Sequence, residues 1–122
     1  MMLKDKERQA DCIASDRVEG TAVYTRDGDK CGSVDCIMIE KVSGQARDAV
    51  LNVGGFLGIG GERHSIPWQK LEYDTDLGGY RLDVTEEELK GAPTFGEQDR
   101  ERAYDRDYQT TVYEYWTVSP YW

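Results

Sequence analysis

Short runs of apolar, β-branched and aromatic residues, separated by turns rich in glycine and aspartate, recur along residues 20–84 of this 122-residue chain. Runs of about four to eight such residues between turn residues are typical of β-strands. Several short strands in succession, with little helix between them, indicate a sandwich or a barrel. We therefore predict an all-β fold, a small β-barrel of about six short strands. The predicted strands cover residues 20–25, 33–40, 47–53, 64–68, 70–74 and 80–84.

Two kinds of hydrophobic pattern distinguish these strands. In the last two, apolar Leu71, Tyr73 and Leu82 alternate with charged residues such as Glu72. Strict alternation predicts one face toward the core and the other in solvent. Residues 36–39 are instead a continuous apolar run, which predicts a strand that is buried on both faces.

A short helical turn is predicted directly after the last strand. Thr85 and Glu88 have the spacing of a capping box, in which the Thr85 hydroxyl accepts from the Glu88 amide while the Glu88 carboxylate reaches back. Gly91 and Pro93 follow, and both residues favour the end of a helix.

The segment 95–122 has a different composition, with five of the eight tyrosines and two of the three tryptophans. A helix over about 97–109 would place Tyr104 and Tyr108 on one face, and residues 111–118 look extended. The segment either packs on its own barrel or docks on a second copy or another protein, because Tyr and Trp are favoured at interfaces. Its interaction candidates are Tyr104, Tyr108, Tyr113, Tyr115, Trp116, Tyr121 and Trp122.

A glycine-rich loop, residues 54–61, joins the third and fourth predicted strands. Phe56, Leu57 and Ile59 stand among its glycines, so we expect an ordered loop that packs, and we count these three as interaction candidates too. A dinucleotide fingerprint would need a third glycine where Arg63 stands and a helix after it. A P-loop would need Lys and then Ser or Thr after the last glycine. We therefore expect a structural loop and no nucleotide cofactor.

Charge and apolar content exclude several classes of protein. The net charge is −9 and no segment is basic, which argues against nucleic acid as a partner. No apolar run approaches the roughly 20 residues of a membrane-spanning helix, and residues 1–15 read as a flexible, charged leader without the apolar core of a signal peptide. Three cysteines without paired spacing indicate reduced thiols, so we expect a cytoplasmic protein.

The residues that could carry chemistry are few. His64 is the only histidine, and Ser65 beside it would point to the opposite face of a strand, so we expect a structural histidine and no catalytic residue. Cys31 and Cys36 alone are too few ligands for a zinc site, and we expect no metal.

Residues 28–35, 49–60 and 66–68 together resemble the PRC-barrel domain family. This domain is shared by the cytoplasmic part of the photosynthetic reaction-centre H subunit, a ribosome maturation factor and many small bacterial proteins. The resemblance covers residues 16–94, which leaves 1–15 as a leader and 95–122 as an extension. The extension is similar to the tyrosine-rich ends of stand-alone bacterial members.

The resemblance implies a binding or scaffold module, since the family has no shared catalytic residues. We expect a non-enzymatic interaction module, a homodimer that associates through the barrel edge and the C-terminal extension, or an adaptor for another protein. One alternative is a soluble relative of the reaction-centre H subunit that acts in the assembly of photosynthetic complexes. Another is a small-molecule binder at the glycine-rich loop.

Overall fold

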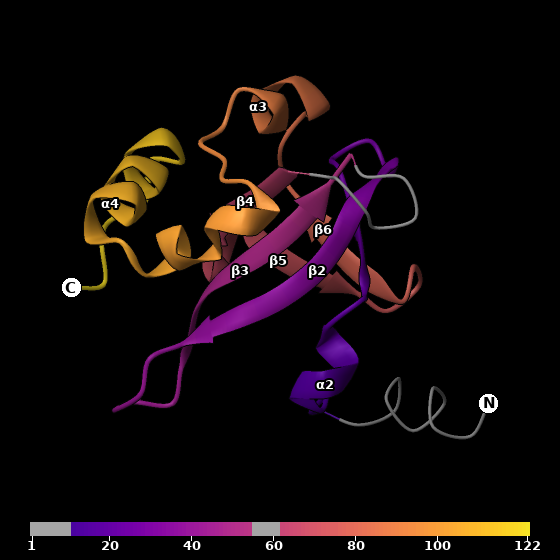
Figure 1. Ribbon diagram of the computed structural model, residues 1–122. Coiled ribbons are helices and arrows are strands. Elements are labelled where there is room, and N and C mark those ends of the chain that lie inside the picture. Colours follow the sequence, from indigo (N-terminus) through magenta and orange to yellow (C-terminus); the bar gives the residue numbers. More distant parts are fainter. Residues whose placement is uncertain (1–10, 55–61) are drawn as a thin grey trace.

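The computed structural model describes residues 11–54 and 62–122, and six strands form one sheet in the order β4-β3-β2-β1-β6-β5. The sheet curls into a half-barrel (Figure 1). The predicted all-β fold of about six short strands is confirmed. The strands are β1 (Ala22–Tyr24), β2 (Lys30–Ile39), β3 (Ala46–Val53), β4 (Glu62–Pro67), β5 (Leu71–Asp74) and β6 (Gly79–Leu82).

Short helices connect and flank the strands. The predicted capping box is present at the start of the helix Glu86–Lys90. The Thr85 hydroxyl accepts from the Glu88 amide at 3.1 Å, and the Thr85 amide donates to the Glu88 carboxylate at 3.0 Å. The described helical segments are α2 (Ser15–Val18), η1 (Trp68–Lys70), α3 (Glu86–Lys90), η2 (Glu97–Tyr104) and α4 (Arg106–Tyr115).

The sheet combines one meander with one hairpin. Strands β1 to β4 pair successively and antiparallel, and β5 pairs antiparallel with β6. The two parts are joined by a parallel pairing, in which Val23 of β1 lies opposite Tyr80 of β6. Because η1 leads from β4 directly into β5, the two outermost strands of the sheet are consecutive in the chain.

The inner face of the curled sheet holds the barrel core. Val34 lies opposite Leu51, which in turn lies opposite His64, and cross-strand partners share a face. Across the other part of the sheet, Leu71 lies opposite Leu82. Val34, Leu51 and Leu82 are all at most 1 % exposed. In β5, Leu71 and Tyr73 are half-buried against the core and Glu72 between them is exposed, as the alternation predicts.

The outer face of β3 and β4 is covered by the C-terminal segment. Helix α4 packs against β4, and η2 packs against both α4 and β4 (Figure 1). An isolated bridge pairs Arg63 of β4 with Phe95, so residues near 95 also cover part of the edge of β4. The chain therefore has a second buried layer outside the barrel.

Two predictions for this C-terminal segment are wrong. Residues 111–118 are not extended, since α4 runs from Arg106 to Tyr115. Tyr104 and Tyr108 do not share a face: Tyr104 ends η2 and is 75 % exposed, whereas Tyr108 is 4 % exposed. Asp105 separates the two helices, because its extended backbone ends η2 while its carboxylate caps α4.

The prediction that residues 36–39 are buried on both faces is also wrong. Cys36 and Met38 are half-buried and Ile39 is 52 % exposed. The reason is the length of β2, which runs with β3 into a hairpin that projects beyond the rest of the sheet (Figure 1). No second layer from the described part of the chain covers the far end of this hairpin.

The close pairing of β2 and β3 generates a stability prediction. A Cβ atom at Gly32 would overlap the backbone carbonyl oxygen of Asn52 and lie 3.2 Å from the Cα of Val53. Backbone atoms in a sheet cannot turn away as a side chain does. Gly32→Ala is expected to lower the free energy of unfolding by about 1–3 kcal/mol, as for overpacking elsewhere.

The matched control is Gly96→Ala, because a Cβ atom at Gly96 meets no atom within 4 Å and the backbone there is not left-handed. This change should leave stability unchanged or raise it slightly. Urea denaturation of both variants measures the difference. Equal stabilities for the two variants would contradict the close approach at Gly32.

Candidate functional site

The structure divides the aromatic candidates of the C-terminal segment into buried and exposed groups. Tyr108, Tyr113 and Trp116 are 3–4 % exposed and belong to the layer between α4 and the sheet. Tyr115 and Trp122 are 40 % and 45 % exposed. Tyr104, already described, is exposed as well, and Tyr121 is half-buried. The segment thus packs on its own barrel with one part of its aromatic side chains and presents the rest at the surface.

A tyrosine and an aspartate hold α4 against β3. The Tyr113 hydroxyl donates to the Asp48 carboxylate at 2.7 Å, and Asp48 is only 2 % exposed. Burial raises the pKa of Asp48 above its ordinary value. Burial also raises the pKa of Tyr113, and the neighbouring carboxylate raises it further, so the phenol keeps its proton.

Two further phenols fix the path of the segment. The Tyr108 hydroxyl donates to the carbonyl of Pro93 at 3.1 Å and accepts from the Ser65 amide at 3.3 Å. The Tyr115 hydroxyl donates to the carbonyl of Glu88 at 2.6 Å. These bonds connect α4 to β4, to the segment before η2 and to α3. The helix is therefore anchored at several points.

A partly exposed cluster of cations and aromatic rings lies beside this anchored helix, with Arg106 and Trp122 exposed and Arg47 and Tyr121 half-buried. The guanidinium carbon of Arg106 lies 4.1 Å from the ring centroid of Trp122, and that of Arg47 lies 4.8 Å from the ring centroid of Tyr121. The rings of Tyr121 and Trp122 meet edge to face, with centroids 5.1 Å apart. We call these four residues the Arg/Trp patch. Cation–π contacts of this kind orient the side chains while leaving them accessible.

His64 and Ser65 do not form a catalytic pair. His64 lies opposite Leu51 on the inner face, whereas Ser65 lies opposite Val50 on the outer face. Both are 3 % exposed, and burial lowers the pKa of His64, which favours the neutral imidazole. The histidine therefore stands in the barrel core, away from any nucleophile on its own strand.

Two of the three cysteines have the character of packed, unreactive thiols, whereas Cys12 is exposed. Cys31 and Cys36 are half-buried and free, and burial raises the pKa of Cys31 to about 11. A thiol with such a pKa is almost entirely protonated near neutral pH. Within residues 11–54 and 62–122, no group of three or more His, Cys, Asp or Glu residues could hold a metal ion.

Within the glycine-rich loop, the structure describes Gly54. Gly54 has a φ of +80°, a backbone conformation that favours glycine. Phe56, Leu57 and Ile59 lie outside the described residues. Their predicted packing and their role as interaction candidates stay predictions.

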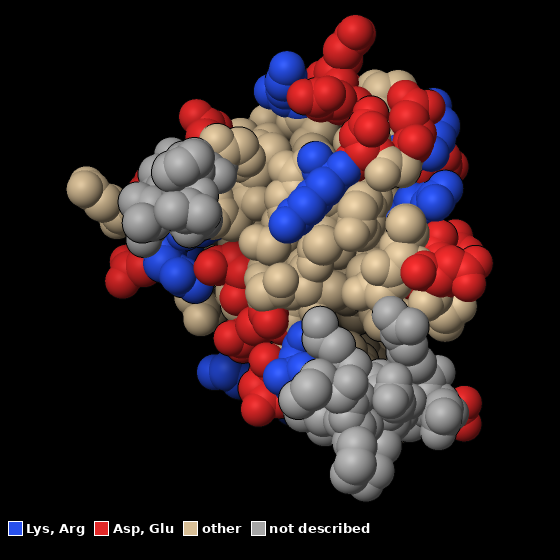
Figure 2. Space-filling model, turned by 90° about the vertical axis from the view of Figure 1, so that its right-hand side faces the viewer, with Lys and Arg blue, Asp and Glu red and all other residues tan. Residues whose placement is uncertain are grey.

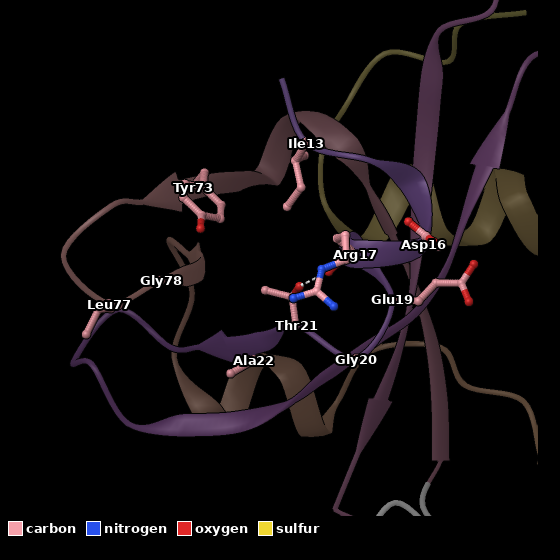
Figure 3. A pocket seen from close by; sticks show the side chains of 10 residues that line it. All are labelled: Ile13, Asp16, Arg17, Glu19, Gly20, Thr21, Ala22, Tyr73, Leu77 and Gly78. Carbon is pink, nitrogen blue, oxygen red and sulfur yellow. Dashed lines mark hydrogen bonds between the residues drawn. The ribbon is translucent and has the colours of Figure 1, made fainter. Parts of the chain in front are cut away.

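A cavity that the sequence did not reveal lies between α2 and the β5–β6 hairpin (Figure 3). Its volume is about 380 Å³, and its lining includes Ile13, Arg17, Thr21, Tyr73 and Leu77. These residues come from two segments that are far apart in the chain. No periodicity within either segment signals a cavity, because it arises only when the parallel pairing of β1 and β6 brings the segments together.

The hydrogen bond between Tyr113 and Asp48 yields the next prediction. Tyr113→Phe removes the donor and leaves a buried carboxyl group without it, which typically costs about 1–3 kcal/mol. Thermal or urea unfolding measures the loss. Tyr104→Phe is the matched control because Tyr104 is mostly exposed, and it should have no measurable effect. Equal effects of the two changes would mean that the buried bond contributes nothing.

A pH prediction follows from the raised pKa of Asp48. The folded chain favours the protonated Asp48 carboxyl more than the unfolded chain does. The contribution of Asp48 to the free energy of unfolding of the wild type therefore falls as the pH rises from the pKa of the unfolded chain, about 3.9, through the higher pKa of the folded chain. Asp48→Asn removes this titration. The stability of the variant relative to wild type should therefore increase between about pH 4 and pH 7. A relative stability that stays constant or decreases over this range would contradict the shift.

Comparison with known proteins agrees with this architecture. The sequence model of the PRC-barrel domain matches residues 11–89, which span the chain from the segment before α2 into α3. No curated protein matches the chain. None of the helices in the described part of the chain has the length and apolar character needed to cross a membrane. The match covers more than half of the chain and all six strands, and the chain belongs to the PRC-barrel domain family.

Proposed function

We propose that this chain is a non-enzymatic protein-interaction module that associates with a second copy through the Arg/Trp patch. The observation that carries the proposal is the exposed stack of Arg106 on Trp122 beside Arg47 and Tyr121. Trp, Tyr and Arg are the residue types that most often dominate binding energy at protein interfaces.

The support beneath the patch strengthens this assignment. Tyr113 lies under the patch, with its ring centroid 6.0 Å from that of Tyr121 and 5.2 Å from that of Trp122. The same tyrosine is hydrogen-bonded to buried Asp48, so the floor of the patch is fixed to the sheet. A surface whose side chains are already ordered loses less conformational entropy on binding.

Charge at the patch favours a second copy as the partner. Glu40 lies next to it and forms a salt bridge with Arg47 at 2.8 Å. The patch and its border therefore carry both signs of charge. Two patches related by a two-fold axis can place Glu40 of one copy near Arg106 of the other, which makes the surface self-complementary.

The proposal that the module is not an enzyme rests on the residues that could carry chemistry. Among the described residues, His64 and Ser65 occupy opposite faces of β4, and the half-buried thiols are held in their protonated form. The two alternatives, a role near photosynthetic complexes and a ligand at the glycine-rich loop, stay predictions. Turnover of a substrate by the purified chain would contradict the non-enzymatic part.

Sedimentation velocity over a range of concentrations tests the self-association. The wild-type chain should form a dimer. Trp122→Ala or Arg106→Ala should raise the dissociation constant of the dimer at least about tenfold, as expected when a hot-spot residue is truncated. Neither change should alter the thermal midpoint strongly, since Trp122 is 45 % exposed.

The control variant is Val42→Ala, which removes an apolar side chain that is 98 % exposed at the turn between β2 and β3. It should leave the dissociation constant unchanged. A wild-type chain that sediments as a monomer at all concentrations would overturn self-association. If Val42→Ala raises the dissociation constant as much as Trp122→Ala does, the two copies meet at the β2–β3 hairpin and not at the Arg/Trp patch.

A further inference from the structure

The two edges of the half-barrel sheet differ in how they are covered. On the β4 edge, Arg63 and Phe95 exchange two backbone hydrogen bonds, so the segment before η2 occupies part of that edge. On the other edge, β5 pairs with β6 alone in the part of the chain that the structure describes. An open strand edge presents N–H and C=O groups that can pair with another chain. β5 is therefore the edge at which a further strand can be added.

The backbone of Tyr73 provides the groups that such a strand needs. The Leu71 amide donates to the carbonyl of Trp68 in η1, and therefore not to β6. In an antiparallel pair, successive residues alternate between facing the partner strand and facing away from it. Tyr73 stands two residues after Leu71, so its N–H and C=O are directed away from β6, toward the open edge. A segment that lies along β5 can therefore exchange two hydrogen bonds with Tyr73.

Hollows on both faces of β5 leave space for the side chains of an added strand. On the inner face, Tyr73 lines the cavity of about 380 Å³ together with Ile13 and Leu77 (Figure 3). On the outer face, two hollows of about 440 and 420 Å³ both include Glu72 and Arg81. Side chains of a strand point alternately to the two faces of a sheet. The residue opposite Tyr73 therefore faces the inner cavity, and its two neighbours face the outer hollows.

The inner face at this edge is apolar. Leu71, Tyr73 and Ile13 are all half-buried and pack against the core. The ring of Tyr73 also meets the ring of Tyr80, with centroids 5.2 Å apart, which holds it in place. An apolar residue opposite Tyr73 therefore buries its side chain against surfaces that are already ordered.

The outer face at the same edge is acidic. Glu72 is exposed and forms no ion pair among the described residues, and Asp76 in the turn after β5 is exposed too. Arg81 does not neutralise Glu72, because its guanidinium pairs with Asp74 at 3.3 Å. On the face that carries the β5–β6 hairpin, groups of acidic side chains border a largely uncharged area (Figure 2). Opposite charges on neighbouring strands stabilise a sheet, so a Lys or Arg beside Glu72 is favoured.

Charge also argues against β5 of a second copy as the added strand. If two β5 strands pair antiparallel about a two-fold axis centred on Glu72, the two Glu72 carboxylates lie opposite each other. An axis centred on Tyr73 instead places Glu72 opposite Asp74 of the other copy. Like charges directly opposite each other are destabilising. A basic segment of a different protein avoids this repulsion.

We propose that β5 accepts an extended segment of another protein as a seventh strand, with the pattern basic–apolar–basic. The apolar residue lies opposite Tyr73 and faces the inner cavity, and the two Lys or Arg residues lie on the outer face beside Glu72 and Asp74. Backbone hydrogen bonds to Tyr73 supply affinity, and the side chains on the two faces supply specificity. This site is separate from the proposed self-association, because β5 contains no residue of the Arg/Trp patch.

Amide-resolved NMR titration of the full chain tests the site, with the capped peptide Thr-Lys-Val-Lys-Thr as the probe. The amides of Glu72, Tyr73 and Asp74 should shift in a saturable manner, and the Tyr73 amide proton should exchange more slowly with solvent. The acidic peptide Thr-Glu-Val-Glu-Thr should bind at least about tenfold more weakly, because it places like charges beside Glu72 and Asp74. N-methylation of the valine removes the N–H that donates to the Tyr73 carbonyl and should weaken binding about fivefold or more.

Two variants connect binding to the charge at this edge. Glu72→Gln should weaken binding of the basic peptide about twofold to fivefold, as expected when an exposed ion pair is lost. Glu114→Gln removes the same charge from an exposed position on α4 and should leave the dissociation constant unchanged. The control is needed because a net charge of −9 attracts a basic peptide to the whole surface. The amide spectrum of each variant reports whether it is folded.

Several results would refute strand addition at β5. These are the absence of saturable shifts at Glu72, Tyr73 and Asp74, equal affinity for the acidic or the N-methylated peptide, and no greater weakening by Glu72→Gln than by Glu114→Gln. Shifts of the β5 amides with protein concentration alone would place a second copy on this edge and would also overturn the proposal. The peptide comparisons leave the protein unchanged, so they stay decisive if a variant unfolds.

Discussion

The burial of the outer face of β3 and β4 depends on the C-terminal segment, which supplies partners for several of its polar groups. A buried carboxylate or amide without a partner would oppose the burial of the apolar side chains around it. Tyr113 satisfies Asp48, and Tyr108 satisfies the Ser65 amide. The peptide groups of Arg63 and Phe95 exchange two hydrogen bonds, each 3.0 Å long. The apolar contacts of α4 bury surface area, and the hydrogen bonds of the tyrosine hydroxyls determine where the helix lies on the sheet.

This arrangement links the second layer to the surface above it. The same helix that buries Tyr108, Tyr113 and Trp116 carries Arg106, and the chain after α4 returns so that Tyr121 and Trp122 lie over Tyr113. A weaker second layer would therefore also disorder the Arg/Trp patch. Stability and the proposed interaction thus depend on the same side chains. The cavity beside α2 is built from other elements and does not share this dependence.

The sequence predicted the barrel well because its strands are short and carry clear turn signals. The capping box at Thr85 was predictable for the same reason, since both partners are three residues apart. Helix α4 was missed because Thr110, Thr111 and Val112 favour strands, and because the helix ends without glycine. Thr117 takes the left-handed conformation there, with a φ of 53°.

The parts of the sites that could not be predicted depend on long-range contacts. The sequence identified Tyr and Trp near the C-terminus as interaction candidates, but only the position of α4 on β4 decides which of them are buried. The cavity was out of reach for a similar reason, since neither Arg17 nor Tyr73 belongs to a motif. Their side chains converge because of how the sheet closes, which is a property of the whole fold.

The parallel pairing of β1 with β6 has a consequence for the order of folding. Strands β2, β3 and β4 pair with chain neighbours and can assemble early, as can the hairpin of β5 and β6. Strand β1 has only three residues and completes its pairing with a strand from the other end of the barrel. Closing such a long loop is entropically unfavourable until both partners are in place. The barrel can therefore close only when β6 is present in the chain, and we expect the pairing of β1 with β6 to be a late step of folding.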